Sequence, residues 1–265
     1  MKTPDEKYIP SGYAEGAVSI LAVLRGSSRD IGEILISENA DRENKNIAEV
    51  LRLCELRNIT VREVSAEEIS KGSSSSTHGG IVASVGERRM KSLDELLSFK
   101  EGFVFMLCGI EDPYNFGDAV RSFYAFGAQG MVLSPRNWLS AASITIRSSA
   151  GATELMDCAV CDDEEALVEA CKKNGIKIVC ACEKDSDSMH RADLSKPMLV
   201  IVGGEKRGIG ASLLAKSDAR IRIPYGRNFN RSLSASAAAA AIGYEITRQS
   251  RKSKHTKKPI RKGRG

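Results

Sequence analysis

The sequence predicts an α/β protein built of two folded parts and a basic tail. In residues 101–247, short runs that are apolar on both faces alternate with helical segments, a pattern typical of a parallel sheet covered on both sides. Residues 1–94 mix helix and strand patterns around a polar loop at 71–80 that is rich in serine and glycine. The 265 residues suffice for one large or two small domains, and we place the boundaries at 1–94, 95–247 and 248–265.

Hydrophobic spacing defines the elements of the first part. Apolar residues recur at helical spacing over Ala14–Leu24 and Ile47–Arg57, which predicts two helices. Short apolar or alternating runs predict strands, because residues on one face of a strand recur at every second position. The predicted strands are Glu33–Ser37, Thr60–Val64 and Ile81–Val85.

In the second part, a helix is expected from Phe116 to Phe126, with Asn115 as its N-cap and Gly127 at its end. The last helix is expected from about Ser234 to Arg248 and begins with small side chains. Continuous apolar runs predict buried strands between the helices. These strands are Phe103–Cys108, Gly130–Leu133, Lys177–Cys182, Met198–Val202 and Ala219–Ile223.

Charge is divided unevenly along the chain. The net charge is +5, but the segment from Arg248 onward contains nine basic residues and no acidic one, so the preceding residues carry −4 in total. Such a segment is too polar to fold alone, and we expect it to be disordered and to bind a polyanion such as nucleic acid. The alternative is a solvated tail that only keeps the protein in solution.

The sequence argues against membrane and exported classes. No window contains about 18 apolar residues without a charge, so no membrane span is expected. The first residues, Met1–Lys7, lack the apolar segment of a secretory signal. We therefore expect a cytoplasmic protein whose thiols are reduced.

Two pairs among the seven cysteines have spacings that a zinc site also uses. They are Cys158 with Cys161 and Cys180 with Cys182. Because these residues fall in predicted strands, buried structural thiols are the favoured interpretation, and no metal is expected.

Ligands of α/β proteins bind at the carboxyl ends of the strands, and three such ends carry unusual residues. Glu111–Arg121 opens a helix and places an arginine among largely apolar side chains. Val202–Ile209 is a glycine-rich turn that allows a ligand close to the backbone, although it is neither a Walker loop nor a dinucleotide fingerprint. Ile223–Ile242 is a polar loop that leads into a helix of small side chains. Each segment alone is also compatible with an ordinary turn or helix start.

Taken together, the three segments resemble the motifs of the SpoU/TrmH family of RNA ribose 2′-O-methyltransferases, in the SPOUT superfamily. The first part, residues 1–94, resembles more loosely the L30e-like substrate-binding domain that often precedes this fold, and the whole resemblance covers about residues 14–248. Two positions depart from the family pattern: Ser234 stands where the third motif has asparagine, and Gly204 where the second often has it. The residues that carry the resemblance are Asn115, Gly117 and Arg121; Ser148–Ala152; Gly203, Glu205 and Gly208; Ile223, Pro224, Ser232 and Leu233; and, in the first part, Gly16, Arg25 and His78–Ile81.

The resemblance implies a fold, a reaction and a set of site residues. The fold would be an L30e-like domain followed by a parallel-sheet SPOUT domain with a deep trefoil knot. The reaction would be methyl transfer from S-adenosylmethionine to a ribose 2′-OH of structured RNA, with ribosomal RNA favoured over transfer RNA, by a homodimer. The implied catalytic residues are Asn115, Arg121, Glu205 and Ser232, and the implied cofactor-binding residues are Gly203, Gly204, Gly208, Ile223 and Leu233.

RNA would be bound by further arginines as well as by the tail. A guanidinium is always protonated, so Arg121 is expected to grip a phosphate rather than to act as a free base. The arginines expected to bind RNA are Arg25, Arg147, Arg207 and Arg231, with Arg88, Arg89, Arg136, Lys206 and Arg227 as further candidates.

Two other functions stay open at this point. The first is a non-catalytic RNA-binding protein with a degenerate methyltransferase domain, for which the departures at Ser234 and Gly204 would argue. The second is a base methyltransferase from another knotted family, against which the Asn115–Arg121 motif argues. Cofactor binding distinguishes an enzyme from the non-catalytic protein. The position of the transferred methyl group distinguishes a ribose methyltransferase from a base methyltransferase.

Overall fold

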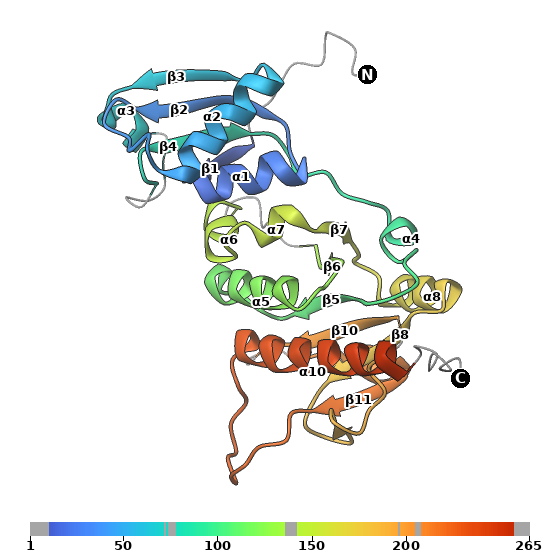
Figure 1. Cartoon of the computed structure of the whole chain (residues 1–265). Coiled ribbons are helices and arrows are strands. Elements are labelled where there is room, and N and C mark those ends of the chain that lie inside the picture. Colours follow the sequence, from blue (N-terminus) through green and yellow to red (C-terminus); the bar gives the residue numbers. More distant parts are fainter. Residues whose placement is uncertain are drawn as a thin grey trace, which may run out of the picture. The chain divides into compact units, whose positions relative to one another are not determined.

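The computed structural model in Figure 1 has the α/β architecture that the sequence predicts. Its contacts divide it into two compact units, whereas the domain boundaries given above stay a prediction. The residues that the structure describes are 11–71, 73, 78–135, 142–195, 197–204 and 208–256. Among them, the first unit comprises 11–91, 112–121 and 135–158, and the second comprises 92–111, 122–134 and 159–256.

The first unit contains a four-stranded sheet in the order β1-β4-β2-β3. β4 is antiparallel to both of its neighbours, while β2 and β3 are parallel. The predicted strands at 60–64 and 81–85 are confirmed with their bounds. The elements are β1 (Gly12–Glu15), α1 (Ala17–Gly26), β2 (Ile31–Ser37), α2 (Lys45–Arg57), β3 (Thr60–Val64), α3 (Ala66–Lys71), β4 (Ile81–Val85), α6 (Ala142–Ser148) and α7 (Ala152–Leu155).

The helix predicted from Ala14 begins only at Ala17, so its first residues were assigned wrongly. Ala14 and Glu15 instead form the end of β1 and pair with Ala83 and Val82 of β4. Gly16 then adopts a φ of 82°, which separates strand from helix and which glycine tolerates best.

The second unit is built on a seven-stranded sheet in the order β7-β6-β5-β10-β8-β11-β9, and its paired strands from β6 to β9 are parallel. Figure 1 draws α10 along β10, and α5 begins in the first unit and ends in this one. Its elements are α4 (Leu93–Leu96), β5 (Phe103–Cys108), α5 (Pro113–Ala125), β6 (Gly130–Leu133), β7 (Asp157–Val160), α8 (Glu164–Asn174), β8 (Lys177–Ala181), β9 (Asp187–Ser188), β10 (Met198–Gly203), α9 (Ala211–Lys216), β11 (Ala219–Arg222) and α10 (Ala235–Thr256).

The N-cap of α5 is Asp112 rather than Asn115. The Asp112 carboxylate accepts a hydrogen bond from the Tyr114 N–H at 3.0 Å, and Pro113 occupies the first helical position, where its missing N–H is harmless. Asn115 therefore lies inside the first turn of the helix.

The basic segment was expected to be disordered from residue 248, but α10 continues through it to Thr256. Extending an existing helix adds one hydrogen bond per ordered residue, which is far easier than starting a new helix. Gln249 also anchors this part of α10. Its amide donates to the carbonyls of Met189 and Ala192 at 3.3 and 3.2 Å and accepts from the Leu194 N–H at 3.0 Å.

All seven cysteines are free thiols, and Cys54, Cys158, Cys171 and Cys180 are buried. Burial raises the pKa of Cys171 and of Cys180 to about 12, so both are protonated at neutral pH. Within the described ranges, no group of three metal-ligating side chains comes together. None of the described helices combines the length and the apolar character that crossing a bilayer requires.

Candidate functional site

Four loops of the second unit leave its sheet at one edge. β10 lies between β5 and β8, with Gly203 opposite Cys108 and Val202 opposite Ala181, and all three strands run in the same direction. β11 continues the order beside β8 with Ile221 opposite Ala181. In a parallel sheet of this kind, ligands bind outside the carboxyl ends of the strands.

A cavity of about 350 Å³ lies at this edge, entirely within the second unit. It is lined by segments that follow β8, β10 and β11 and by the start of α10. Sequence reasoning missed the wall that Cys182, Glu183 and Lys184 form after β8, although the strand-end rule applies to it equally. The predicted site residues that the structure brings together here are Gly203, Gly204, Gly208, Ile223, Ser232 and Leu233.

Close backbone packing explains the glycines of the turn after β10. A Cβ atom at Gly204 would lie 2.5 Å from the carbonyl oxygen of Gly109, and one at Gly203 would lie 3.0 Å from the Cα of Gly208. The Gly204 N–H donates to the Cys108 carbonyl at 2.7 Å, which ties the turn to the end of β5. A side chain at position 204, including the asparagine of the family pattern, would push this turn away from Gly109.

The loop after β11 closes the cavity from another side. The Leu233 N–H donates to the Tyr225 hydroxyl at 3.1 Å, which draws the two ends of the loop together. The Ser234 hydroxyl accepts from the Ala237 N–H at 3.3 Å and so caps α10. Serine and asparagine are both strong N-cap residues, so Ser234 keeps the capping role that an asparagine at this position would fill.

The predicted residues of the first motif lie on α5, in the first unit, where Asn115 and Arg121 are both exposed. Gly117 between them is buried because α5 packs closely on α6: a Cβ atom at this position would lie 1.9 Å from the Ser148 hydroxyl. That hydroxyl oxygen lies 3.3 Å from the Pro113 carbonyl oxygen and 2.9 Å from that of Ile144, one turn back on α6. The motif glycine is therefore a packing requirement of the helix that carries the two polar residues.

Glu205 and Arg207 lie outside the described residues, as do Arg136 and Lys206. Arg25, Arg227 and Arg231 are exposed, as a phosphate contact requires. Other arginines are engaged within the first unit. These are Arg147, 3.2 Å from the buried carboxylate of Glu15; Arg89, paired with Asp30; and Arg88, buried beside Glu154.

Arg88 is therefore excluded as a phosphate contact, and its assignment from sequence was wrong. Its side chain is only 6% exposed, and its guanidinium is used by Glu154 and by the Met156 carbonyl. Sequence alone does not reveal this, because a buried arginine has the same local pattern as a surface one.

Comparison with known proteins matches both parts of the chain. Residues 102–244 match the SpoU rRNA Methylase family, and residues 13–90 match the family described as RNA 2′-O ribose methyltransferase substrate binding. The chain is 26% identical to the Bacillus subtilis protein YacO, named for the TrmH family of tRNA/rRNA methyltransferases, over 89% of this chain and 95% of YacO.

Two further proteins are similar over most of their length. One is the 23S rRNA (guanosine-2′-O-)-methyltransferase RlmB of Bordetella pertussis, 28% identical over 88% of this chain and 96% of RlmB. The other is the crystal structure of the SpoU methyltransferase AviRb from Streptomyces viridochromogenes with AdoMet. It superposes with a TM-score of 0.75 at 22% identity, over 91% of this chain and 90% of AviRb. Since the first family covers more than half of the sequence, the chain belongs to the SpoU rRNA methylase family.

Proposed function

We propose that this protein transfers a methyl group from S-adenosylmethionine to a ribose 2′-OH of structured RNA, with ribosomal RNA as the substrate class. The observation that carries the proposal is the cavity at the carboxyl edge of the second sheet. It is lined by all five predicted cofactor-binding residues and by Ser232, although these residues come from separate segments of the chain. Membership of the SpoU rRNA methylase family supports the same reaction.

The residues around the cavity suit S-adenosylmethionine. The volume falls within the roughly 300–1,000 Å³ that small-molecule sites occupy. The glycine turn at 203–204 presents bare backbone, and Ile209 and Ile242 offer apolar surface for a flat purine. Glu183 and Lys184 provide one charge of each sign for the amino-acid end of the cofactor. When bound, this cofactor supplies a methyl group on a positively charged sulfur.

The protein's own residues have to prepare the acceptor oxygen. A ribose hydroxyl is a weak nucleophile until its proton is removed or shared. A guanidinium is not a free base in proteins, so the role of Arg121 is to grip a phosphate beside the reacting ribose through its two parallel N–H donors. This grip orients the sugar and stabilises the negative charge that develops on the oxygen, and the held phosphate takes the proton. Asn115 and Ser232 orient the arginine or the ribose. The role that the family resemblance implies for Glu205 is to fix the glycine-rich segment 202–209.

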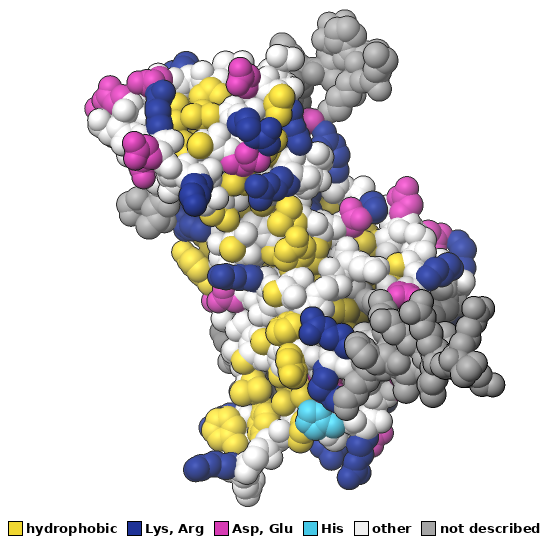
Figure 2. All heavy atoms as spheres, viewed as in Figure 1, with side chains coloured by type: hydrophobic (Ala, Val, Ile, Leu, Met, Phe, Trp, Pro, Cys, Tyr) yellow, Lys and Arg dark blue, Asp and Glu magenta, His cyan; other side chains and the backbone are white. Residues whose placement is uncertain are grey.

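The family resemblance also includes a homodimer and a deep trefoil knot, and both belong to this proposal. Exposed aromatic side chains in the second unit, on α10 and at the C-terminal end of α5, support a dimer. Tyr124 on α5 and Tyr244 on α10 are 40% and 60% exposed, and Tyr244 packs edge-on against Phe126 at 6.0 Å between ring centroids. Figure 2 shows further apolar side chains gathered over α10 and the loop that precedes it. Ribosomal RNA as substrate points to the cytoplasm as the site of action.

The test is methyl transfer to ribosomal RNA by the full chain. The purified protein is titrated with S-adenosylmethionine by calorimetry and then incubated with the tritium-labelled cofactor and unmodified ribosomal RNA. We expect one binding site per chain and label retained in the RNA. Cofactor binding without transfer to any RNA would contradict the proposal, and RNA binding without cofactor binding would indicate the non-catalytic alternative.

We do not expect that alternative outcome, because both departures from the family pattern have a structural role. Gly204 allows the turn to lie against the Gly109 carbonyl, and Ser234 caps α10. Neither substitution removes the walls of the cavity.

Removing the end of the basic tail is expected to weaken RNA binding. Truncation after Thr256 removes five of the nine basic residues from the tail and keeps Gln249 with its hydrogen bonds. For every phosphate that the shortened tail no longer neutralises, the slope of log K against log salt becomes shallower by about 0.7–0.9. The measurement is RNA affinity at a series of salt concentrations. The control has the same length as the full chain, with glutamine at these five basic positions, and an unchanged slope in both variants would assign the tail to solubility.

A further inference from the structure

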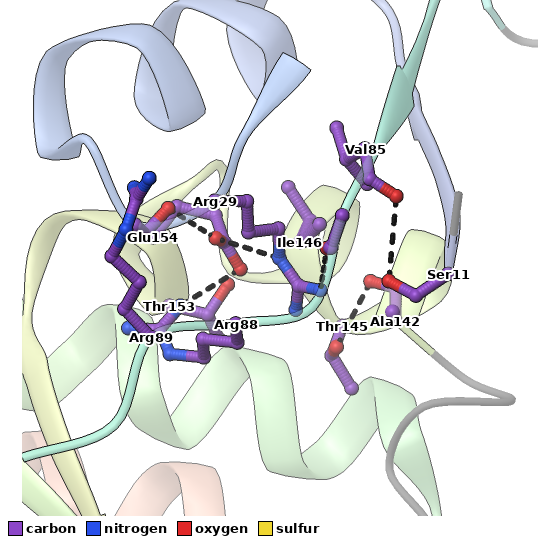
Figure 3. Close-up of polar contacts among 12 residues, drawn as sticks. Ser11, Arg29, Val85, Arg88, Arg89, Ala142, Thr145, Ile146, Thr153 and Glu154 are labelled. Carbon is purple, nitrogen blue, oxygen red and sulfur yellow. Dashed lines mark hydrogen bonds and ion pairs between the residues drawn. The ribbon is translucent and has the colours of Figure 1, made fainter. Parts of the chain in front are cut away.

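A cluster of buried charges joins the N-terminal sheet to α7 within the first unit. The Glu154 side chain, on α7, is 1% exposed, and those of Arg29 and Arg88 are 7% and 6% exposed. Arg29 Nε lies 3.0 Å from one carboxylate oxygen and Arg88 Nη1 lies 2.9 Å from the other. The Ser28 hydroxyl donates to the first of these oxygens at 2.5 Å. Figure 3 shows the carboxylate of Glu154 between Arg29 and Arg88.

The three buried charged side chains, Glu154, Arg29 and Arg88, have to stay together. Burial alone would raise the pKa of Glu154, but Arg88 and Arg29 outweigh this effect, so the pKa is lowered and the carboxylate is ionised at neutral pH. Arg29 also donates to the Gly86 carbonyl at 3.2 Å, and Arg88 to the Met156 carbonyl at 2.6 Å. A buried charge without its partner is strongly unfavourable, so the segments cannot separate without exposing all three side chains to water.

Beside the cluster, α1 and α7 pack so closely that they cannot slide past one another. A Cβ atom at Gly26, at the end of α1, would lie 2.0 Å from the carbonyl oxygen of Glu154. One at Gly151, before α7, would lie 2.4 Å from the Cβ of Ala22 on α1. Backbone and small side chains therefore touch directly on both sides of the ion pairs.

The first unit also contains the first part of α5, the helix that carries Arg121. α7 follows α6 directly in the chain, and α6 contacts α5 through Ser148, whose hydroxyl lies against Gly117 and 3.3 Å from the Pro113 carbonyl oxygen. Residues 112–121 fall in the same compact unit as residues 11–91. Direct contacts thus lead from the N-terminal sheet through Glu154 to α5.

We propose that Glu154 is a positioning residue: it fixes the substrate-binding segment 13–90 to α7 and so holds bound RNA at a constant place relative to Arg121. The expected effect on turnover rests on the proposed methyl transfer, whereas the fixed distance between segment 13–90 and α5 does not. Alignment of the reacting groups is a large component of catalysis, and a small displacement lowers turnover even where binding persists.

The first test measures a distance and needs no substrate. Spin labels on non-natural residues at exposed positions 52, on α2, and 114, on α5, report the separation between the N-terminal sheet and α5 by pulsed electron resonance. We expect one narrow distribution for the full chain and a broad one for Glu154→Gln. The matched control is Asp157→Asn, which removes a nearby carboxylate from an exposed pair with Lys91 at 2.6 Å and should keep the narrow distribution. A broad distribution in the unmutated chain would overturn the proposal.

The second test measures turnover on the same variants without the labels. For Glu154→Gln we expect kcat to fall at least tenfold. The Kd for S-adenosylmethionine should stay within twofold of the unmutated chain, because the cofactor cavity lies in the other unit. The Kd for RNA should also stay within twofold. Unchanged kcat despite a broadened distance would overturn the positioning role. If Glu154→Gln does not fold, Arg29→Lys keeps the charge, loses the planar fork, and is expected to show both effects in weaker form. Absence of methyl transfer in every variant, with the distance results as expected, would count against the proposed function and not against the rigid connection.

Discussion

Replacing Arg121 by alanine is expected to lower methyl transfer at least about 100-fold while S-adenosylmethionine binds as before. A preorganised donor of this kind contributes roughly 2.7 kcal/mol or more to the barrier, which corresponds to that factor. Arg121 is exposed on α5, so its loss removes no core contact and the fold should persist. The measurement is single-turnover methyl transfer to ribosomal RNA, with calorimetry for cofactor affinity.

Two further variants make the result for Arg121 specific. Arg121→Lys keeps the positive charge but loses the two parallel donors, so it should recover only part of the activity. Arg52→Ala removes another exposed arginine, on α2, and should leave turnover unchanged. Transfer by Arg121→Ala at the rate of the unmutated protein would remove this residue from the mechanism.

Adding one methyl group to the glycine turn is expected to weaken cofactor binding severely. In Gly204→Ala, the new Cβ would stand 2.5 Å from the Gly109 carbonyl oxygen, so the turn has to move away from β5 and deform the wall of the cavity. Overpacking of this kind costs about 2 kcal/mol, or roughly a thirtyfold loss of affinity. Calorimetric titration with S-adenosylmethionine gives the value directly.

Gly226→Ala is the matched control for this variant. Gly226 belongs to the same unit, and a Cβ atom there would meet no other atom within 4 Å. We expect this variant to bind the cofactor like the unmutated chain. Equal affinities for the two alanine variants would mean that contact between the turn and the end of β5 does not shape the cofactor site.

Local sequence patterns predicted an element correctly where its contacts with distant parts of the chain favour the same structure. The strands at 60–64 and 81–85 have their predicted bounds, and the alternation of helices with two-faced apolar strands correctly indicated a parallel sheet. The start of α1 was missed because pairing with β4, distant in sequence, converts Ala14 and Glu15 into a strand. The end of α10 was missed because its polar residues extend a helix that is already anchored, through Gln249, to the segment after β9.

The cavity was more predictable than the contacts of single arginines. Its glycines and the residues of the last loop follow strands and belong to recognisable motifs, and they do line one cavity. Cys182 and Lys184 follow a strand as well, but no motif distinguished them. The buried cluster had no local signal at all, since Arg29 and Glu154 are 125 positions apart and meet only in the folded chain.

The position of the transferred methyl group tests the central proposal most directly. Ribosomal RNA is incubated with the protein and with S-adenosylmethionine that carries a deuterated methyl group, then digested to nucleosides and analysed by mass spectrometry. The account predicts the heavy methyl group on the ribose of a single nucleoside type, and its absence when Arg121→Ala replaces the unmutated protein. A heavy methyl group on a base, or on no nucleoside although the cofactor is bound, would contradict it.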